Sequence, residues 1–461
     1  MSHKREWSMF LGILLAIITS IVALIENNIA VFVFAGFWFL LGVMVIKITL
    51  PVTNRYRSYK LYILFFAIYY AFMLITNYTY VSNPYRDFFY TIDSLEFYST
   101  MDSILQYKNG ADAYDMVLYE ARHWRGFGVL IWLTGRIAQI VGGENSIIIQ
   151  KLQIVFLASM TTVFLYNMSR IYLSQIQSWK IAISFGLLTH LLVFSGVFNR
   201  DLHIALIYTM GFYILLSSWR FRNLFILILL CFLAWQFRVQ HGIFFFGFVG
   251  VFILLRLRNL YDKVASFFLG LLFIVGIAAF VFLNIGKYEK ETTGKLEHYQ
   301  EYHEEQFKEA TGLTAIVNRL PAVFQPVANI VLSQTYPYPP HRAVNVNVTG
   351  ETQYLKFPLS IAQVYWILVW FILLYGLFYK KNRVAIPQPI IYTLILAFLL
   401  IISVSIASYE FRRMLGAYPM IYLASAFIYF KMDKKKRNMI VQRLLLLQLG
   451  MFVFYIILKG F

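Results

Sequence analysis

Apolar stretches recur along almost the whole chain, and short polar or charged junctions separate them. Stretches of about 17 to 23 apolar residues are long enough for a helix to cross a bilayer. The pattern therefore predicts an all-α polytopic membrane protein with about 13 transmembrane helices. We expect spans near residues 7–25, 29–50, 61–80, 147–168, 181–198, 202–218, 223–240, 242–255, 265–285, 360–379, 388–407, 414–430 and 439–458.

One further apolar stretch, residues 127–141, is interpreted as an interfacial or re-entrant helix. If it crossed, the basic clusters at residues 55–60 and 220–222 would lie on opposite faces, whereas a non-crossing helix puts every dense basic cluster on one face. That face then holds 22 of the 40 Lys and Arg residues and 3 acidic residues, a charge of +19; the other face holds 18 basic and 19 acidic residues, a charge of −1. The positive-inside rule therefore predicts a cytoplasmic N-terminus and an outer C-terminus.

Composition agrees with this topology, since 60% of the residues are hydrophobic and only 13% are charged. Such a chain is not a soluble domain. The net charge of +18 follows from the topology, so it does not predict a nucleic-acid partner. The single cysteine, Cys231, lies in an apolar run and is interpreted as a packing residue. We expect the first apolar segment to be a retained span and not a cleaved signal peptide.

The spacing of the apolar stretches divides the chain into four parts. We expect an N-terminal helical hairpin in residues 1–60, and a transmembrane core in residues 61–285 that contains an outer acidic loop at 81–146. A second outer loop covers residues 286–358, and C-terminal transmembrane helices cover 359–461. Loops of this length often carry function, and two on one face could roof a membrane cavity.

The first outer loop contains candidate catalytic acids. A helix that begins near Thr91 would present Asp93 and Glu96 on one face. Such carboxylates can act as a general base, bind a cation or simply be solvated. Their position close to a span end favours a functional role, with Asp93 as the first candidate and Glu96 and Asp87 as competitors. Solvated helix faces are expected for Asp112, Asp115 and Glu120.

The second outer loop offers weaker signals. His298, Glu301, Glu305 and Glu309 follow one side of an amphipathic helix, which could hold a metal ion but is more typical of an exposed charged face. A divalent metal ion is therefore left open, and no other cofactor is predicted. The Pro-rich stretch of residues 336–342 could cover a cavity or stack on a sugar, which makes Tyr336 and Tyr338 candidate substrate-binding residues.

Charged residues also lie at three short outer junctions between apolar spans. Ionisable groups in such places usually face a cavity, a partner or a ligand. Arg200 with Asp201, and Glu410 with Arg412, could instead form local ion pairs. Guanidinium groups suit phosphate oxygens because their donors form a planar fork. The residues that we predict to bind a lipid phosphate are Arg200, Arg238, His241, Arg412 and Arg413, and Glu410 is a further substrate-binding candidate.

This layout resembles the GT-C glycosyltransferases, which use polyprenyl-phosphate-linked sugars. The likeness rests on the acidic segment Thr91–Tyr98, on the apolar stretch Gly126–Val141, and on the Asn199-Arg200-Asp201 and Phe411-Arg412-Arg413 junctions. It implies that Asp93 activates an acceptor hydroxyl while arginines bind the lipid phosphate. Two features depart from the family: the acids Asp93 and Glu96 are three residues apart instead of adjacent, and two spans precede the one that leads into the acidic loop.

The chain is also similar to exopolysaccharide and O-antigen polymerases, which join lipid-linked repeat units. Both resemblances imply surface-glycan assembly in a multi-pass protein of the bacterial inner (plasma) membrane. The implied partners are a polyprenyl-phosphate-linked sugar, a glycan or lipid-linked acceptor, and membrane lipids. A lipid-oligosaccharide flippase or other transporter is the alternative of a different class, although the two long outer loops and the odd number of expected spans favour a transferase.

Overall fold

The computed structural model describes residues 3–79, 92–107, 109–121, 124–217, 221–257, 320–321, 324–335, 357–379, 384–407 and 411–459. Within these ranges the chain forms helices and connections, with no strand. The helices are α1 (His3–Ile25), α2 (Ile29–Thr49), α3 (Val52–Thr79), α4 (Ile92–Ile104), α5 (Gly110–Glu120), α6 (Arg125–Ile140), α7 (Ile147–Ser169), α8 (Gln175–Leu188), α9 (His190–Phe194), α10 (Asp201–Leu216), α11 (Phe221–Phe237), α12 (Val239–Leu257), α15 (Gln325–Thr335), α16 (Phe357–Phe378), α17 (Gln388–Ala407), the 3-10 helix η5 (Phe411–Met414), α18 (Tyr418–Lys431) and α19 (Lys434–Lys459). Every expected span overlaps at least one of these helices, except the span 265–285, which lies outside the described ranges.

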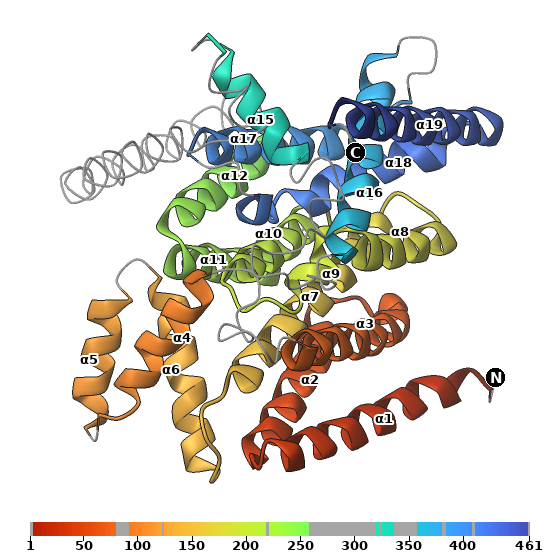
Figure 1. The fold of residues 1–461 in the computed structure, drawn as a ribbon. Coiled ribbons are helices and arrows are strands. Elements are labelled where there is room, and N and C mark those ends of the chain that lie inside the picture. The colour runs from red at the N-terminus through yellow and green to blue at the C-terminus, as the bar shows by residue number, and fades with distance from the viewer. Residues whose placement is uncertain are drawn as a thin grey trace.

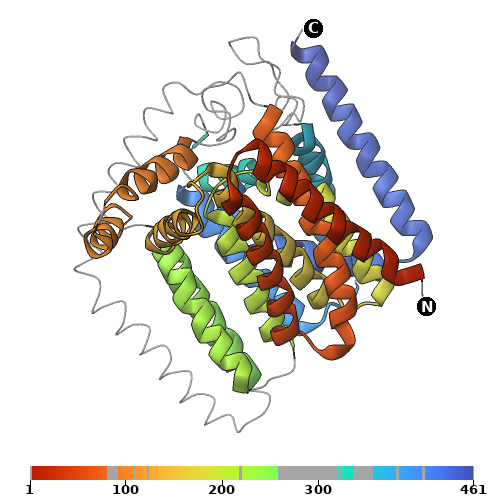
Figure 2. The ribbon, with the colours of Figure 1, turned by 90° about the horizontal axis from the view of Figure 1, so that it is seen from below.

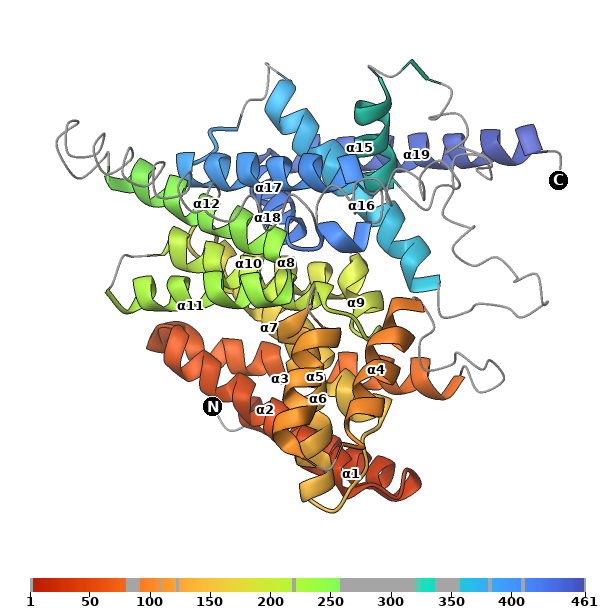
Figure 3. The same cartoon turned by 90° about the vertical axis from the view of Figure 1, so that its left-hand side faces the viewer.

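Helix α7 is the centre of the bundle. Figures 1 and 3 show α1–α3 at one edge, α7, α10 and α11 in the middle, and α16, α17 and α19 towards the opposite edge. All 23 residues of α7 are buried, and α2, α3, α8 and α10 pack around it. Its sequence is apolar on nearly every side, so burying it requires neighbours all round its circumference.

Helices α1 and α2 pack together as a helical hairpin within residues 1–60, and α3 begins inside this region at Val52. Asn27 adopts a φ of 48°, a left-handed conformation that asparagine tolerates better than most residues. The Asn28 side chain caps α2 by accepting a hydrogen bond from the Ala30 amide at 3.1 Å. It also donates to the Glu144 carbonyl at 2.8 Å, which ties the hairpin to the segment before α7. Because α1 and α2 also pack on α3, the hairpin is part of the bundle.

Much of the expected outer acidic loop is helical. Helices α4, α5 and α6 pack on one another and run across the direction of α8, α10 and α19 (Figure 1). In this group Phe97 lies 4.7 Å from Trp124 and 5.4 Å from Phe127, measured between ring centroids. Helix α6 corresponds to the stretch 127–141 and also packs against α11; that it does not cross the membrane stays a prediction. The three acids of α5 that were expected to be solvated, Asp112, Asp115 and Glu120, are exposed.

The span expected at 181–198 is not one continuous helix, because the chain bends at Thr189. Helix α8 ends at Leu188, and the short helix α9 begins at His190. Thr189 has extended backbone angles, and its hydroxyl accepts a hydrogen bond from the Leu191 amide at 3.4 Å while donating to the Phe185 carbonyl at 2.6 Å. Local bonds of threonine hydroxyls compete with helix continuation, and the hydropathy pattern does not register them.

Polar side chains join the helices of the C-terminal half. Gln334 of α15 accepts hydrogen bonds through Oε1 from the indoles of Trp366 and Trp370, each at 3.2 Å. Gln363 of α16 donates to the Gln334 carbonyl at 3.1 Å, and its own Oε1 lies 3.2 Å from Nε2 of His190. These bonds satisfy buried polar groups that would otherwise disfavour the apolar interior.

Five helical segments in the described part of the chain are long and apolar enough to cross a membrane, and they belong to α2, α3, α7, α16 and α17. Shorter apolar helices, α10 and α11 among them, accompany these five. Large apolar side chains on α1, α2 and α19 are exposed, as expected for surfaces that contact lipid tails. The helices are therefore those of a membrane-embedded protein, whereas the total of 13 spans and the orientation stay predictions.

Cysteine labelling tests the orientation. Ile176 at the start of α8 and Tyr119 near the end of α5 have similar exposed fractions, 71% and 68%. In a Cys231→Ser background, we expect an impermeant thiol reagent on intact cells to label Tyr119→Cys and to spare Ile176→Cys. After the membrane is permeabilised, both should react. Labelling of both in intact cells would mean that the stretch 127–141 crosses.

A glycine allows α8 to approach α3 closely. A methyl group at Gly186 would collide with the ring of Phe65, whereas a methyl group at Gly36 of α2 would meet no atom within 4 Å. We expect Gly186→Ala to reduce the free energy of unfolding by about 1–3 kcal/mol through overpacking. Gly36→Ala is the matched control and should be neutral or slightly stabilising. Equal thermal unfolding midpoints for the two variants in detergent would contradict this close contact.

Candidate functional site

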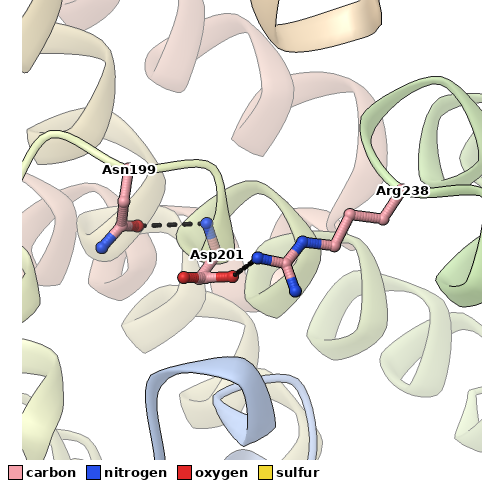
Figure 4. A network of polar contacts seen from close by, with 3 residues as sticks. All are labelled: Asn199, Asp201 and Arg238. Atoms are coloured by element: carbon pink, nitrogen blue, oxygen red, sulfur yellow. Dashed lines mark hydrogen bonds and ion pairs between the residues drawn. The ribbon is translucent and has the colours of Figure 1, made fainter. Parts of the chain in front are cut away.

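Three helix junctions that are distant in sequence meet around Asp201. The first connects α9 to α10, where Asp201 is the first residue of the helix and is 4% exposed. The Asn199 side chain fixes this turn, because its Oδ1 accepts a hydrogen bond from the Asp201 amide at 3.1 Å (Figure 4). A carboxylate at a helix N-terminus is also stabilised by the helix dipole.

The second junction separates α11 from α12 and contributes Arg238. One of its terminal guanidinium nitrogens lies 2.6 Å from Oδ1 of Asp201, and Figure 4 shows the two side chains approaching from neighbouring helices. The backbone around Arg238 remains almost helical, since its amide bonds to the Ala234 carbonyl at 2.9 Å and its carbonyl accepts from the Gly242 amide at 3.0 Å. Burial makes this ion pair sensitive to the loss of either partner.

The third junction is η5, which carries Arg412 and Arg413 between α17 and α18. Arg412 is only 7% exposed. The positive charges of Arg238, Arg412, Arg200 and Arg413 all act on the Asp201 carboxylate. We refer to these four residues as the arginine cluster. A local ion pair of Arg200 with Asp201 was left open as an alternative; the charge of Arg200 acts on the Asp201 carboxylate, which also forms an ion pair with Arg238 of another junction.

Arg200 connects the arginine cluster to the α4–α6 group. Its guanidinium carbon lies 5.4 Å from the centroid of the Phe97 ring of α4, a cation–π distance. Phe97 in turn packs against Trp124 and Phe127. The arginine cluster therefore adjoins the helices of the acidic segment.

Two buried histidines lie beside the cluster. Nδ1 of His241 is 3.4 Å from the Tyr208 hydroxyl, and the two rings meet edge to face. His203 stacks on Phe237 with a centroid separation of 4.3 Å. His241 was predicted to bind a lipid phosphate; it lies three residues after Arg238, whose charge acts on it, and Tyr208 is its hydrogen-bond partner.

A series of hydrogen-bonded polar side chains, half-buried at Asp102 and Asn145 and buried further in, runs from α4 to His203. Asn145 donates to Oδ1 of Asp102 at 2.8 Å and accepts from Gln150 at 2.8 Å. Gln153 donates to Gln150 at 3.5 Å, and its Oε1 lies 3.2 Å from Nε2 of His203. In this arrangement His203 donates through Nε2, because the Gln153 oxygen is an acceptor. The series fixes α4, α7 and α10 relative to one another close to the arginine cluster.

The sequence did not predict most of these hydrogen-bonded polar residues, nor the contact of Phe97 with Arg200. One signal was present: Gln150, Lys151 and Gln153 lie in the first two turns of an otherwise apolar segment. All three are buried, and Lys151 donates to Oδ1 of Asn77 at 3.2 Å. Polar groups in such a segment need partners inside the protein, so they indicate contacts with other helices.

Two of the three predicted catalytic acids, Asp93 and Glu96, lie on α4. A helix was expected near Thr91, and α4 begins at Ile92. Asp93 lies one helical turn before Phe97, so the two positions share a face of α4. Glu96 is exposed. The described residues do not include Asp87, the substrate-binding candidates Tyr336, Tyr338 and Glu410, or the charged helix face of His298, Glu301, Glu305 and Glu309.

A metal site and a cysteine site are the other kinds of site to consider in the described ranges. There, no group of three His, Cys, Asp or Glu side chains is gathered as a metal site. Cys231 is half-buried on α11 and packs against the hydrophobic core, which confirms its packing role.

The chain matches no known protein-family model, and no curated protein resembles it significantly in sequence.

Proposed function

We propose that this protein is a membrane glycosyltransferase that uses a polyprenyl-phosphate-linked sugar at the outer face of the membrane, in the manner of GT-C enzymes. The observation that carries the proposal is the convergence of the arginine cluster on one buried carboxylate, beside the helix that bears Asp93. The partners would be the lipid-linked sugar, a glycan or lipid-linked acceptor, and the surrounding lipids.

The composition of the cluster favours an anion with several oxygens. Four guanidinium groups act on the single carboxylate of Asp201. A phosphate supplies both the negative charge and the acceptor oxygens that such groups prefer. The low dielectric near the apolar helices strengthens this attraction relative to water.

Asp93 would act as the general base. Position 93 shares a face of α4 with Phe97, and Phe97 contacts Arg200; in this proposal the reacting sugar carbon would lie beside that face, next to the bound phosphate. The acceptor hydroxyl would lose its proton to Asp93 while its oxygen forms the new bond to the sugar carbon. The bond between that carbon and the phosphate oxygen would break, and the arginines would neutralise the departing lipid phosphate.

The remaining predicted residues keep secondary roles in this proposal. Glu96 and Asp87 are the alternative bases, and Tyr336, Tyr338 and Glu410 would contact the sugar or the acceptor. The proposal leaves a divalent metal ion open as a further counter-charge for the phosphate beside the arginines.

Phosphate binding can be tested at Arg412. Undecaprenyl phosphate serves as the probe, and its affinity for the purified protein is measured by fluorescence titration. We expect Arg412→Ala to weaken binding about tenfold to a hundredfold, because charge-assisted hydrogen bonds are lost from a buried site. Arg412→Lys should give an intermediate affinity, since it keeps the charge but loses the planar fork.

The control for this titration is Arg443→Ala, which removes an exposed arginine on α19. It should bind the probe like the parent. If Arg412→Ala, Arg200→Ala and Arg413→Ala all keep the parental affinity and differ only in stability, the arginine cluster holds helices together and the proposed phosphate site is wrong.

The reaction class needs a separate experiment. The purified protein is incubated with a panel of polyprenyl-phosphate-linked monosaccharides and glycan acceptors, and products are identified by mass spectrometry. Addition of one sugar supports the proposed transferase. Joining of whole lipid-linked repeat units would favour the polymerase, and translocation across liposomes without any new glycosidic bond would favour the flippase.

A further inference from the structure

A second candidate site lies between α8, α16, α18 and α19, which gather on one side of the bundle (Figure 1). These helices enclose a groove of about 670 Å³. Along α8 its lining extends from Trp179 to Leu188, and along α18 from Tyr422 to Phe430. Tyr422 and Phe430 are eight residues apart along a helix, which corresponds to about 12 Å, so the groove is elongated. Its volume falls in the range of small-molecule and lipid sites.

The charge of the groove is concentrated at one end. Lys180 in the second turn of α8 and Arg437 in the first turn of α19 are the charged residues of its lining, and both are cations. Neither forms an ion pair with any acid in the described ranges. The Arg437 guanidinium lies 4.7 Å from the centroid of the Tyr429 ring, and its buried Nε has no hydrogen-bond partner there either. This end therefore suits an anionic group.

The rest of the groove is neutral and largely apolar. Half-buried Ile183, Leu187 and Leu368 line it. Its main polar feature is a set of hydroxyls that satisfy one another: the Tyr422 hydroxyl lies 2.6 Å from that of Ser184 and 2.5 Å from that of Tyr365. Because these hydroxyls already have partners, a hydrocarbon chain can lie against this wall without leaving a buried polar group unsatisfied.

We propose that an anionic phospholipid occupies this groove, with its phosphate between Lys180 and Arg437 and an acyl chain along the apolar walls. A cationic end next to an aromatic residue, Trp179, is the arrangement that membrane proteins use at the headgroup level. A free phosphate ion would satisfy the cations but would leave the apolar length of the groove empty. The cations of this site lie near the starts of α8 and α19, whereas the arginine cluster belongs to other helix junctions. The lipid proposal therefore does not depend on the proposed transferase activity.

The probes are phosphatidylglycerol and phosphatidylcholine with the same acyl chains. Each lipid is titrated into delipidated full-length protein, and bound lipid is counted by native mass spectrometry. We expect phosphatidylglycerol to bind in preference. Lys180→Ala and Arg437→Ala should each lower its affinity about fivefold, as removal of one basic residue at a headgroup does. Lys435→Ala is the matched control, because Lys435 is exposed on the same helix and does not line the groove.

A second variant, Ala426→Phe, should block the groove, because Ala426 lines it. It should reduce binding of phosphatidylglycerol while leaving both cations in place. Equal binding of the two lipids, or parental binding in Lys180→Ala and Arg437→Ala, would overturn the proposal. Displacement of phosphatidylglycerol by an equal concentration of undecaprenyl phosphate, or by inorganic phosphate alone, would also overturn it, since the occupant would then be a polyprenyl lipid or a simple anion.

Discussion

Asp93→Asn is expected to lower turnover about a hundredfold or more. The substitution keeps the size of the side chain and removes the basicity that proton abstraction from the acceptor requires. Binding of undecaprenyl phosphate should persist, because in the proposal the phosphate is held by the arginine cluster. Turnover is measured as sugar transfer from the lipid-linked donor found in the panel experiment, and binding is measured by fluorescence titration.

Two neighbouring acids provide the controls for this prediction. Glu96→Gln changes an exposed position of the same helix and should retain most activity. Asp102→Asn changes a half-buried acid that accepts a hydrogen bond from Asn145 at 2.8 Å, so it should affect stability more than turnover. Parental product formation by Asp93→Asn, together with an inactive Glu96→Gln or Asp87→Asn, would assign the base to that neighbour instead.

Arg238→Ala is expected to lower the free energy of unfolding by about 3–5 kcal/mol, because it leaves the buried Asp201 without its ion-pair partner. Asp201→Ala should also be strongly destabilising, since four guanidinium groups would then lose the carboxylate on which they act. The double variant should recover part of the loss, with a coupling energy of about 1–3 kcal/mol. The measurement is equilibrium unfolding in mixed micelles.

The exposed Arg443→Ala variant is again the control and should change stability by less than about 0.5 kcal/mol. If the losses in Arg238→Ala and Asp201→Ala simply add in the double variant, the two side chains are not coupled. The 2.6 Å contact would then contribute nothing specific to the fold.

Helix positions could be predicted well where hydropathy alone decides them. The span expected at 147–168 is the helix Ile147–Ser169, and the span expected at 29–50 is the helix Ile29–Thr49. In both, a long apolar run has only the helix as a way to satisfy its backbone in a membrane. Hydropathy did not indicate the break at Thr189, where one side-chain hydroxyl bonds to the backbone and a helix ends inside an apolar run.

For the candidate site, the sequence identified the residues but not their partners. Arg200, Arg238, Arg412 and Arg413 were selected as charged groups at the ends of apolar segments, and the structure brings their charges to Asp201. A local pair of Arg200 with Asp201 stayed open as an alternative because the two residues are adjacent in sequence. The sequence did not reveal that Asp201 also pairs with Arg238 of another junction, 2.6 Å away.

The sequence by itself determined that this protein is helical and membrane-embedded, because each apolar run carries that information locally. The tertiary structure alone decided which junctions meet, which polar residues of α7 are bonded to Asn145 and to α10, and where an apolar groove ends in two cations. These features depend on how helices pack side by side, and packing is set by shape and close contact between residues far apart in the chain. Hydropathy and spacing do not encode such contacts, so only the folded chain reveals them.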